Sequence, residues 1–297
     1  MVDRPRRSCL FMPASNPRAI AKARTLPCDV VILDLEDAVA EERKDEARAA
    51  AVAAAREGGF GKRELVVRVN AGDTRWAADD LAALAAARVD AVLLPKVGSA
   101  DDVAQVRALL GDDGPALWAM VESARGLHAL PALADAAASL RLTALVAGTN
   151  DLALDLRCRP GADRAPLLPA LARIVAAARA GGMAALDGVL NAIDDDERLA
   201  AECAQGRDWG FDGKTLIHPA QIDAANAAYG PTAAELDWAR RVIALWADPA
   251  NAARGAVRMD GAMVERLHLA EAERILALAG QGRIAAQPAM TDNPASR

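Results

Sequence analysis

Two carboxylates, Glu122 and Asp151, are the side chains whose type and position most suggest chemistry. Each follows a short apolar segment, ALWAMV before Glu122 and TALVAG shortly before Asp151. If these segments form neighbouring parallel strands, both carboxylates lie at the same edge of the sheet and within reach of one ion. Oxygen ligands that leave room for water suit Mg²⁺ or Mn²⁺. The alternative, a helix cap and an ion pair with Arg125, stays open on spacing alone.

Polar or charged residues end most of the other apolar segments as well. They are Glu36, Asp37, Arg68, Asn70, Lys96, Asn150, Asp187 and His218. In a closed parallel barrel all strands end on one face, so we expect these groups to converge on one pocket. Helix capping accounts for Ser99, but it accounts poorly for long charged side chains such as Arg68 and Lys96.

These residue types suggest separate roles in such a pocket. Glu36 and Asp37 are expected to be catalytic, as acid–base groups or as partners that bind the metal through water. Arg68 has a planar fork that suits a substrate carboxylate, although an ion pair with Glu36 or Asp37 is an alternative. Gly148 offers a position where a ligand can approach the backbone closely.

Eight short apolar segments alternate with Ala-rich, helix-like segments, which is typical of parallel α/β architecture. The predicted strands are Ser8–Pro13, Val30–Glu36, Glu64–Asn70, Ala91–Val97, Ala116–Ser123, Thr143–Gly148, Met183–Leu190 and Gly213–His218. Eight strands make one (β/α)₈ TIM barrel, and such barrels run to ~250 residues. We therefore assign residues 1–230 to a barrel catalytic domain.

The segment after the barrel differs in pattern. Pro231–Asp248 and Gly261–Leu278 are predicted helices, separated by an irregular stretch, Pro249–Met259. Residues 231–280 are therefore expected to form a helical cap or an oligomerisation segment. Residues 281–297 lack periodicity and are expected to be a disordered tail.

Composition excludes several classes of function. The formal net charge is −6, and basic residues are not clustered, so no nucleic-acid partner is expected. The four cysteines form no CxxC pair, and the apolar run Cys9–Met12 is too short for a signal peptide or a membrane span. We expect a cytoplasmic protein without a membrane partner. Neither GxxxxGK[ST] nor GxGxxG occurs.

A series of motifs spans nearly the whole chain. In order they are RSCLFMPASNPR, DLEDAV, LVVRVNAGDTRW, VLLPKV, AMVESARGL, AGTNDLALDL and GFDGKTLIHPAQI. Together they resemble the citrate lyase β-subunit (HpcH–HpaI aldolase) family, which includes malyl-CoA and citramalyl-CoA lyases. The resemblance implies a TIM barrel that assembles as a homotrimer or a hexamer, with Mg²⁺ bound by Glu122 and Asp151.

The resemblance also implies roles for individual residues. Arg68 inherits contact with the carboxylate of a 2-oxo acid, and Lys96, Glu122 and Gly148 are further predicted substrate contacts. Arg18 and Lys22 match basic residues that lie near the phosphates of coenzyme A. Many relatives carry a catalytic aspartate in a DGxMID-like motif that enters the adjacent subunit. Here the matching position is Glu265, in DGAMVE, so this sequence departs from the family pattern.

The implied activity is that of a carbon–carbon lyase. A citryl-, malyl- or citramalyl-CoA thioester would be cleaved to an acyl-CoA and a 2-oxo acid by retro-Claisen chemistry. One alternative is a (3S)-malyl-CoA thioesterase, which would release free CoA and form no 2-oxo acid. Another is a β-type subunit that is active only with acyl-carrier and transferase partners.

Overall fold

The computed structural model describes residues 4–280 and divides into two compact units. One unit is Arg6–Tyr229, and the other begins at Gly230 and also includes the N-terminal residues up to Pro5. Residues 281–297, where a tail was expected, lie outside the described part.

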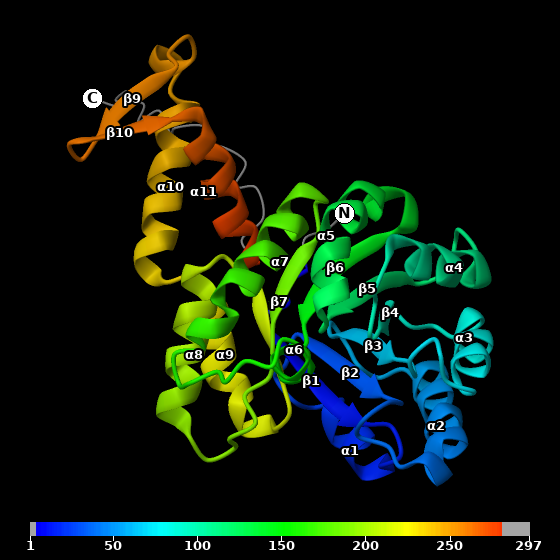
Figure 1. Cartoon of the computed structure of the whole chain (residues 1–297). Helices are drawn as coiled ribbons and strands as arrows, with labels where there is room; N and C mark the ends of the chain where they lie inside the picture. Colours follow the sequence, from blue (N-terminus) through cyan, green and yellow to red (C-terminus); the bar gives the residue numbers. More distant parts are fainter. Residues whose placement is uncertain (1–3, 281–297) are drawn as a thin grey trace, which may run out of the picture. The chain divides into compact units, whose positions relative to one another are not determined.

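The unit Arg6–Tyr229 is a closed barrel of eight parallel strands in sequential order (Figure 1), which confirms the predicted fold. The strands are β1 (Ser8–Pro13), β2 (Val30–Asp34), β3 (Glu64–Arg68), β4 (Ala91–Leu94), β5 (Ala116–Val121), β6 (Leu142–Ala147), β7 (Ala184–Asp187) and β8 (Gly213–Leu216). All but β1 end one to three residues earlier than predicted. Arg68 and Asp187 remain the last residues of their strands, and the other polar residues expected at strand ends follow the strands.

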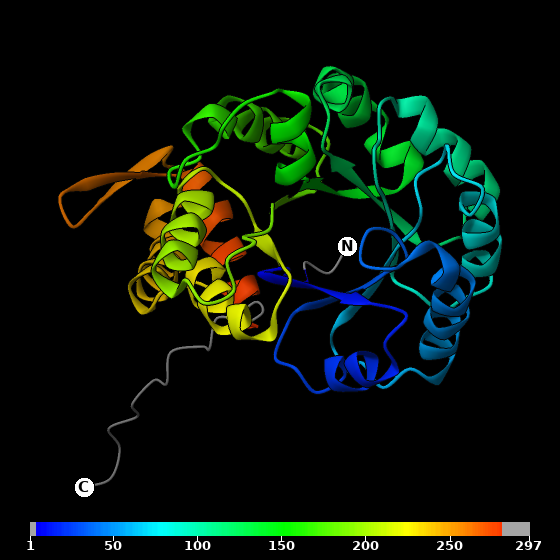
Figure 2. The ribbon, with the colours of Figure 1, turned by 60° about the horizontal axis from the view of Figure 1, so that its bottom comes forward.

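Helices surround the strands, as Figure 2 shows. They are α1 (Pro17–Ala23), α2 (Lys44–Glu57), α3 (Ala77–Ala85), α4 (Ala100–Leu110), α5 (Ala124–Leu140), α6 (Thr149–Asp155), α7 (Leu168–Ala180), α8 (Asp196–Asp208) and α9 (Ile222–Tyr229). Short 3₁₀ turns precede several of them: η1 (Glu41–Arg43), η2 (Ala165–Leu167) and η3 (Pro219–Gln221). Ser99 and Ser123 begin α4 and α5 as N-caps, each accepting a backbone N–H through its hydroxyl.

Alternate residues of each strand face opposite sides of the barrel wall. The set that includes Val30, Ile32, Val66, Trp118 and Leu186 packs together inside the barrel. Residues of the opposite parity pack against the helices in the larger outer core. Both faces are buried, which explains why the strands read as continuous apolar segments.

The N-terminal end of the barrel is closed by an ion pair. Arg6 donates to Glu64 through Nε and Nη2, at 2.7 and 2.9 Å, and its guanidinium lies 4.9 Å from the ring centroid of Trp118. This pair lies at the opposite end of the strands from the residues expected to carry chemistry.

The second unit contains α10 (Ala233–Ala247), η4 (Pro249–Asn251), β9 (Ala256–Met259), β10 (Ala262–Glu265) and α11 (Arg266–Leu278). The prediction of an irregular stretch followed directly by a helix is wrong here, because β9 and β10 form an antiparallel hairpin. Asp260 and Gly261 join the strands with φ of 52° and 85°. A two-residue Asp-Gly turn with positive φ matches the twist of a hairpin, and this signal was present in the sequence.

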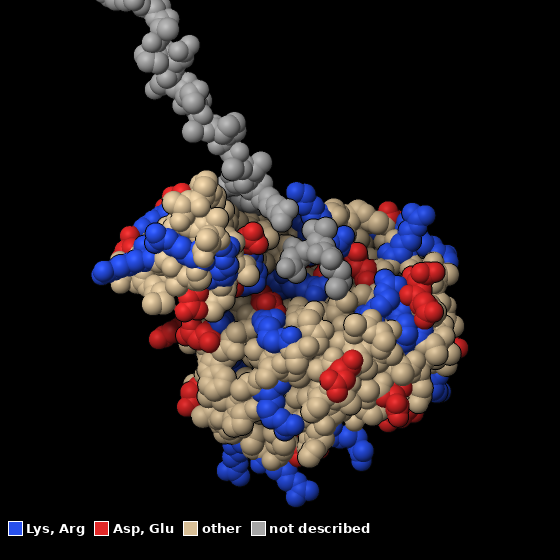
Figure 3. Space-filling model, turned by 90° about the horizontal axis from the view of Figure 1, so that it is seen from above, with Lys and Arg blue, Asp and Glu red and all other residues tan. Residues whose placement is uncertain are grey.

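No helix within residues 4–280 is long and apolar enough to cross a membrane. Figure 3 shows acidic and basic side chains intermingled on the face it presents.

Candidate active site

A pocket of about 310 Å³ lies at the C-terminal ends of the barrel strands. It is lined by Phe11, Asp34, Asp37, Ala38, Arg68, Met120, Glu122, Ala147, Gly148, Thr149, Asn150, Asp151, Val189, Asn191, Thr215 and Ile217. The predicted residues Asp37, Arg68, Glu122, Gly148 and Asp151 therefore share one pocket.

Glu122 and Asp151 line this pocket from neighbouring strands. Glu122 follows β5 and is 4 % exposed, and Asp151 lies in the first turn of α6. Glu122 is not a helix cap, since Ser123 caps α5; instead its Oε1 accepts the backbone N–H of Lys96 at 2.5 Å. Burial raises the pKa of Glu122, and the nearby Asp151 carboxylate raises it further, while the Lys96 N–H opposes the shift.

Gly148 permits the close packing of α6 on Glu122. A Cβ at this position would lie 2.4 Å from the Cβ of Glu122 and 2.6 Å from its Oε2. Any side chain would therefore displace the Glu122 carboxylate. In the structure, the absence of a side chain at Gly148 leaves room for Glu122. The sequence had suggested only that a ligand approaches the backbone at Gly148.

Lys96 has φ of 52°, in the left-handed region that a non-glycine residue seldom adopts. This conformation directs its N–H at Glu122, while its Nζ lies 3.5 Å from Glu36 Oε1. Lys96 thus joins the two carboxylates through different parts of the same residue. Strained backbone of this kind is concentrated at functional sites.

Arg68 has a principal partner that the sequence analysis missed. Its Nε and Nη2 donate to both oxygens of Asp34, each at 2.6 Å. Its Nη1 contacts Glu36 Oε2 at 2.9 Å and Asp37 Oδ2 at 3.3 Å, and donates to Met120 Sδ at 3.8 Å. Burial opposes the charge on Arg68, yet Asp34 and the other two carboxylates raise its pKa. The ion pairs with Glu36 and Asp37 that were considered as an alternative are both present.

Strand alternation places Asp34 in the pocket, but the sequence does not show its phase because both faces of the strands are apolar. Asp34 has the parity of Val30 and Ile32, so it points into the barrel, and it is the register partner of Arg68. Its carboxylate also accepts the N–H groups of Glu36 and Ala38 at 3.0 Å. Asp34 therefore orients both Arg68 and the loop that carries Glu36.

Glu36 is a buried acid with incomplete hydrogen bonding. Its side chain is 8 % exposed, and neither of its oxygens has a hydrogen-bond partner among residues 4–280 beyond its charge contacts. Burial raises the pKa of Glu36 to about 7; Arg68 opposes this shift, while Asp37 and Glu122 add to it. A carboxyl group with this pKa can both accept and release a proton near neutral pH.

A buried lysine holds the backbone of the Glu36 loop. Lys44, at the start of α2, donates from Nζ to the carbonyl oxygens of Leu35 at 2.8 Å and Glu36 at 2.7 Å. Asp37 lies beyond this support, and its side chain is 63 % exposed. The two predicted acids therefore differ: Glu36 is enclosed, and Asp37 faces solvent.

The expected convergence is wrong for Asn70, Asp187 and His218, which do not line the pocket. Glu36 and Lys96 are also absent from its lining, but they contact the lining residues Arg68 and Glu122. Asn70 is turned toward α3, where its amide donates to Asp80 Oδ2 at 2.7 Å. Asp187 is fully buried on the helix side of β7, next to the inward-facing Leu186. His218 is exposed and caps η3 through its Nδ1. Asn70 and His218 lie after the ends of their strands, so strand alternation does not fix the direction of their side chains. Asp187 lies within β7, where strand alternation directs its side chain outward.

Three further predicted residues are not among those that line the pocket. Arg18 and Lys22 are exposed on α1. Glu265 is exposed at the end of β10 and forms a capping box with His268 at the start of α11. It belongs to the second unit.

The charges in and beside the pocket suit a cation. Four carboxylates, Asp34, Asp37, Glu122 and Asp151, line the pocket with one cation, Arg68. Glu36 and Lys96 lie beside it and contact Arg68 and Glu122 respectively. No cluster of three or more His, Cys, Asp or Glu residues with metal-binding geometry occurs in residues 4–280. A two-carboxylate site remains compatible with Mg²⁺, which keeps several waters and needs few protein ligands.

Comparison with known proteins identifies the family. The HpcH/HpaI aldolase/citrate lyase family matches residues 7–219. The chain belongs to this family. The match covers all eight barrel strands and every pocket-lining residue. It therefore agrees with the resemblance carried by the sequence motifs.

Individual relatives of this HpcH/HpaI aldolase/citrate lyase family member fall into two groups. A (3S)-malyl-CoA thioesterase of Cereibacter sphaeroides is 47 % identical over 93 % of this chain and 95 % of its own length. The citrate lyase subunit beta of Escherichia coli is 35 % identical over 88 % and 89 %. Among solved structures, CitE from Mycobacterium tuberculosis in complex with magnesium, acetoacetate and coenzyme A is 37 % identical. It has a TM-score of 0.74 and covers 93 % of this chain and 98 % of that one.

Proposed function

We propose that this chain is a Mg²⁺-dependent enzyme that acts on a malyl-CoA-type thioester. The charge of the pocket carries the proposal, because four carboxylates and only one cation line it. Glu122 and Asp151 would hold the cation. A bound Mg²⁺ supplies Lewis-acid stabilisation of negative charge on substrate oxygens. Magnesium in the related CitE complex supports this assignment.

The protein's own groups would supply the remaining chemistry. Arg68 presents Nη1 to a substrate carboxylate, while Asp34 keeps the guanidinium fixed through Nε and Nη2. Glu36, with a pKa of about 7, would accept a proton from the attacking water or from the substrate hydroxyl. Glu265 would protonate the product if it reaches a barrel, and Arg18 and Lys22 would contact the coenzyme A phosphates.

Hydrolysis of the thioester is the first candidate reaction. The relatives at 47 % identity are thioesterases, and the alignment covers almost all of both chains. In hydrolysis, water oxygen bonds to the thioester carbonyl carbon, the C–S bond breaks, and the thiol leaves with a proton. The products are malate and free CoA.

Carbon–carbon cleavage of the same thioester is the second candidate. Citrate lyase subunits at 35 % identity and the oxaloacetate–magnesium complex of a M. tuberculosis citrate lyase beta subunit favour it. Here Glu36 would take the hydroxyl proton, and the bond between the hydroxyl-bearing carbon and the carbon next to the thioester would break. The resulting enolate would take up one proton, which gives acetyl-CoA and a 2-oxo acid. Both reactions would use the same pocket. The lyase activity expected from the sequence therefore stays a candidate together with the thioesterase activity.

One assay separates the two reactions. Purified protein with Mg²⁺ and malyl-CoA is monitored with a thiol reagent for free CoA and with phenylhydrazine for glyoxylate. Free CoA without glyoxylate identifies hydrolysis, and glyoxylate with acetyl-CoA identifies cleavage. Neither product should form in Glu122→Gln or Asp151→Asn. A wild-type protein that forms neither product from malyl-, citramalyl- or citryl-CoA would overturn the proposal.

A further inference from the structure

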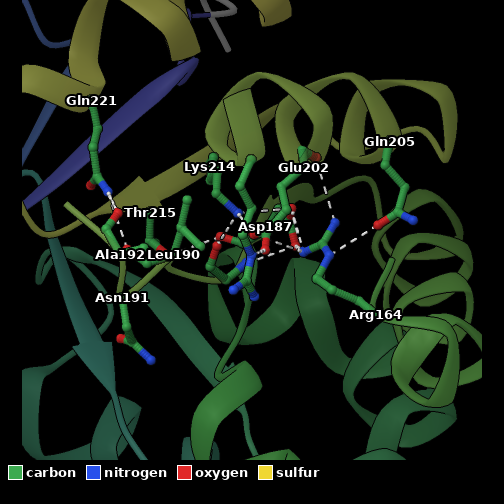
Figure 4. Close-up of polar contacts among 12 residues, drawn as sticks. Arg164, Asp187, Leu190, Asn191, Ala192, Glu202, Gln205, Lys214, Thr215 and Gln221 are labelled. Carbon is green, nitrogen blue, oxygen red and sulfur yellow. Dashed lines mark hydrogen bonds and ion pairs between the residues drawn. The ribbon is translucent and has the colours of Figure 1, made fainter. Parts of the chain in front are cut away.

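Four charged residues lie buried together behind the β7–β8 side of the pocket (Figure 4). Lys214 and Asp187 are fully buried, and Glu202 and Arg164 are 3 and 5 % exposed. Lys214 Nζ contacts Asp187 Oδ2 at 3.3 Å and Glu202 Oε2 at 3.1 Å, and Arg164 Nη1 donates to both oxygens of Asp187 at 2.8 and 2.9 Å. The positive and negative charges balance within the group.

Such a cluster contributes little to stability by itself, because removing charges from water costs about as much as their pairing returns. The other hydrogen bonds of the cluster indicate what it holds. Lys214 Nζ donates to the carbonyl oxygen of Gly188 at 2.6 Å, and Asp187 Oδ1 accepts the N–H of Gly188 at 2.8 Å. The first residue after β7 is therefore bound on both its N–H and its C=O.

Gln221 extends this support along the same segment. Its buried amide donates to the carbonyl oxygens of Leu190 at 3.1 Å and Ala192 at 3.4 Å. Its Oε1 accepts the N–H of Ile217 at 3.1 Å, which ties the segment to the end of β8. Lys214 and Gln221 together hold every second carbonyl of residues 188–192.

The residues between these held carbonyls face the pocket. Val189 and Asn191 both line it, and Asn191 extends away from Gln221 and the charged cluster in Figure 4. Across the pocket mouth, Asn191 and Asn150 exchange amide hydrogen bonds of 2.9 and 3.2 Å. Asn150 immediately precedes Asp151, so the amide pair borders the proposed metal site.

The pocket has three parts that differ in charge. The β2–β3 side presents Arg68, which can contact a carboxylate through Nη1, together with its partners Asp34 and Asp37. The middle presents Glu122 and Asp151, and the β6–β7 side presents the neutral amides of Asn150 and Asn191. A malyl-CoA-type substrate carries a carboxylate at one end and an uncharged thioester carbonyl at the other. Neutral amides match the thioester end.

We infer that Asn191 donates its amide N–H to the thioester carbonyl oxygen and that Lys214 and Gln221 are positioning residues for it. This inference rests on the proposed function and assigns it a further substrate-contacting residue. Negative charge develops on that oxygen when water attacks the carbonyl carbon, and also when C–C cleavage leaves an enolate. A fixed N–H donor stabilises the charge in both reactions.

Two unreactive analogues test the contact. One is succinyl-dethia-CoA, in which CH₂ replaces sulfur and the hydroxyl is absent, so that neither hydrolysis nor C–C cleavage can occur while the carbonyl is kept. The other is the 3-carboxypropyl thioether of CoA, which lacks the carbonyl oxygen. Asn191→Leu should weaken binding of the carbonyl analogue about tenfold and leave the thioether unchanged. Affinity for Mg²⁺ should not change. Equal weakening of both analogues, or wild-type protein that binds both equally, would overturn the inference.

The positioning role predicts the same signature from buried residues that do not touch substrate. Lys214→Met and Gln221→Leu should each reduce the preference for the carbonyl analogue several-fold, within the limit of about tenfold set by one hydrogen bond. Arg6→Met is the control, because it breaks a partly buried ion pair in the same barrel at the opposite end. It should lower stability without changing the preference.

If Lys214→Met does not fold, Lys214→Met/Glu202→Gln restores the charge balance and is used instead. An unchanged preference in the Lys214 and Gln221 variants, or an altered one in Arg6→Met, contradicts the positioning role. The analogue experiment needs no turnover, so it is distinguishable from failure of the proposed function. Suppose that the wild-type protein turns over no thioester, yet Asn191→Leu reduces the preference for the carbonyl analogue. The proposed reaction would then be wrong, and the proposed contact of Asn191 with the carbonyl oxygen would stand.

Discussion

On the β2–β3 side of the pocket the Asp34–Arg68 ion pair faces the ligand space, whereas on the β7–β8 side the Asp187–Lys214 pair lies behind the strands. Asp34 and Asp187 are each the last residue of a strand, and each is the register partner of its cation. The two pairs differ in parity. Asp34 is two residues after the inward-facing Ile32, so it also faces into the barrel. Asp187 directly follows the inward-facing Leu186, so it faces outward toward the helices.

The difference separates two uses of a buried charge. The inward pair presents an arginine nitrogen to the pocket and can act on a ligand directly. The outward pair can act only through the backbone it holds, which carries the neutral amide of Asn191. Substitutions on the two sides should therefore have different effects on activity even where their effects on stability are alike.

Asp34→Asn should have the largest effect. Removing one partner of a buried ion pair costs about 3–5 kcal/mol of unfolding free energy. It also frees the Arg68 fork and the Glu36 loop, and misplacement near 1 Å can cost ~10²-fold in rate. We expect kcat/KM for the thioester to fall at least ~10²-fold, measured beside urea unfolding. Activity within tenfold of wild type would contradict the role given to Asp34.

Asp187→Asn should destabilise the fold by a similar amount, about 3–5 kcal/mol, because Lys214 and Arg164 lose their shared partner. Its effect on kcat/KM should be only about tenfold, since the effect reaches the substrate through one hydrogen bond. Urea unfolding and steady-state kinetics on the same preparation give both values. Equal activity losses in Asp34→Asn and Asp187→Asn would remove the distinction between the two sides.

The raised pKa of Glu36 predicts that the stability of the metal-free protein depends on pH. This pKa is about 7 in the fold against an ordinary 4.5, so the folded state binds more protons between these values. Stability should therefore fall as pH rises through that window, by up to about 3 kcal/mol. Denaturant unfolding in EDTA at pH 5, 6, 7 and 8 measures the slope. Glu36→Gln should flatten it, and an unchanged slope in this variant would assign the effect to other groups.

Lys96→Gly should have the smallest effect on metal binding. Glycine adopts positive φ without strain, so the N–H on Glu122 is kept while the ammonium near Glu36 is lost. We expect Mg²⁺ affinity within about threefold of wild type. Lys96→Val is the matched variant, because a β-branched residue disfavours positive φ, and its affinity should fall about tenfold. Calorimetric titration with Mg²⁺ compares them. Equal loss in both variants would assign the effect to the ammonium.

The candidate site was only partly predictable from the chain. Glu122, Asp151, Arg68 and Gly148 were identified from strand-end position, and all four line the pocket. Asp34 was missed and Asp187 misassigned for one reason: the strands are apolar on both faces, so their alternation gives no visible phase. The Asp260–Gly261 hairpin turn was missed although its signal was local.

Sequence alone determined the eight-strand parallel barrel, because continuous apolar segments alternating with Ala-rich helices allow few other arrangements. It also determined that charged residues follow the strands. The tertiary structure decided which of those charges face the ligand and which lie beneath the helices. Closing the sheet sets the absolute orientation of every strand, and a shift of one residue exchanges the two faces. Only that closure turns Asp34 toward the pocket and Asp187 away from it.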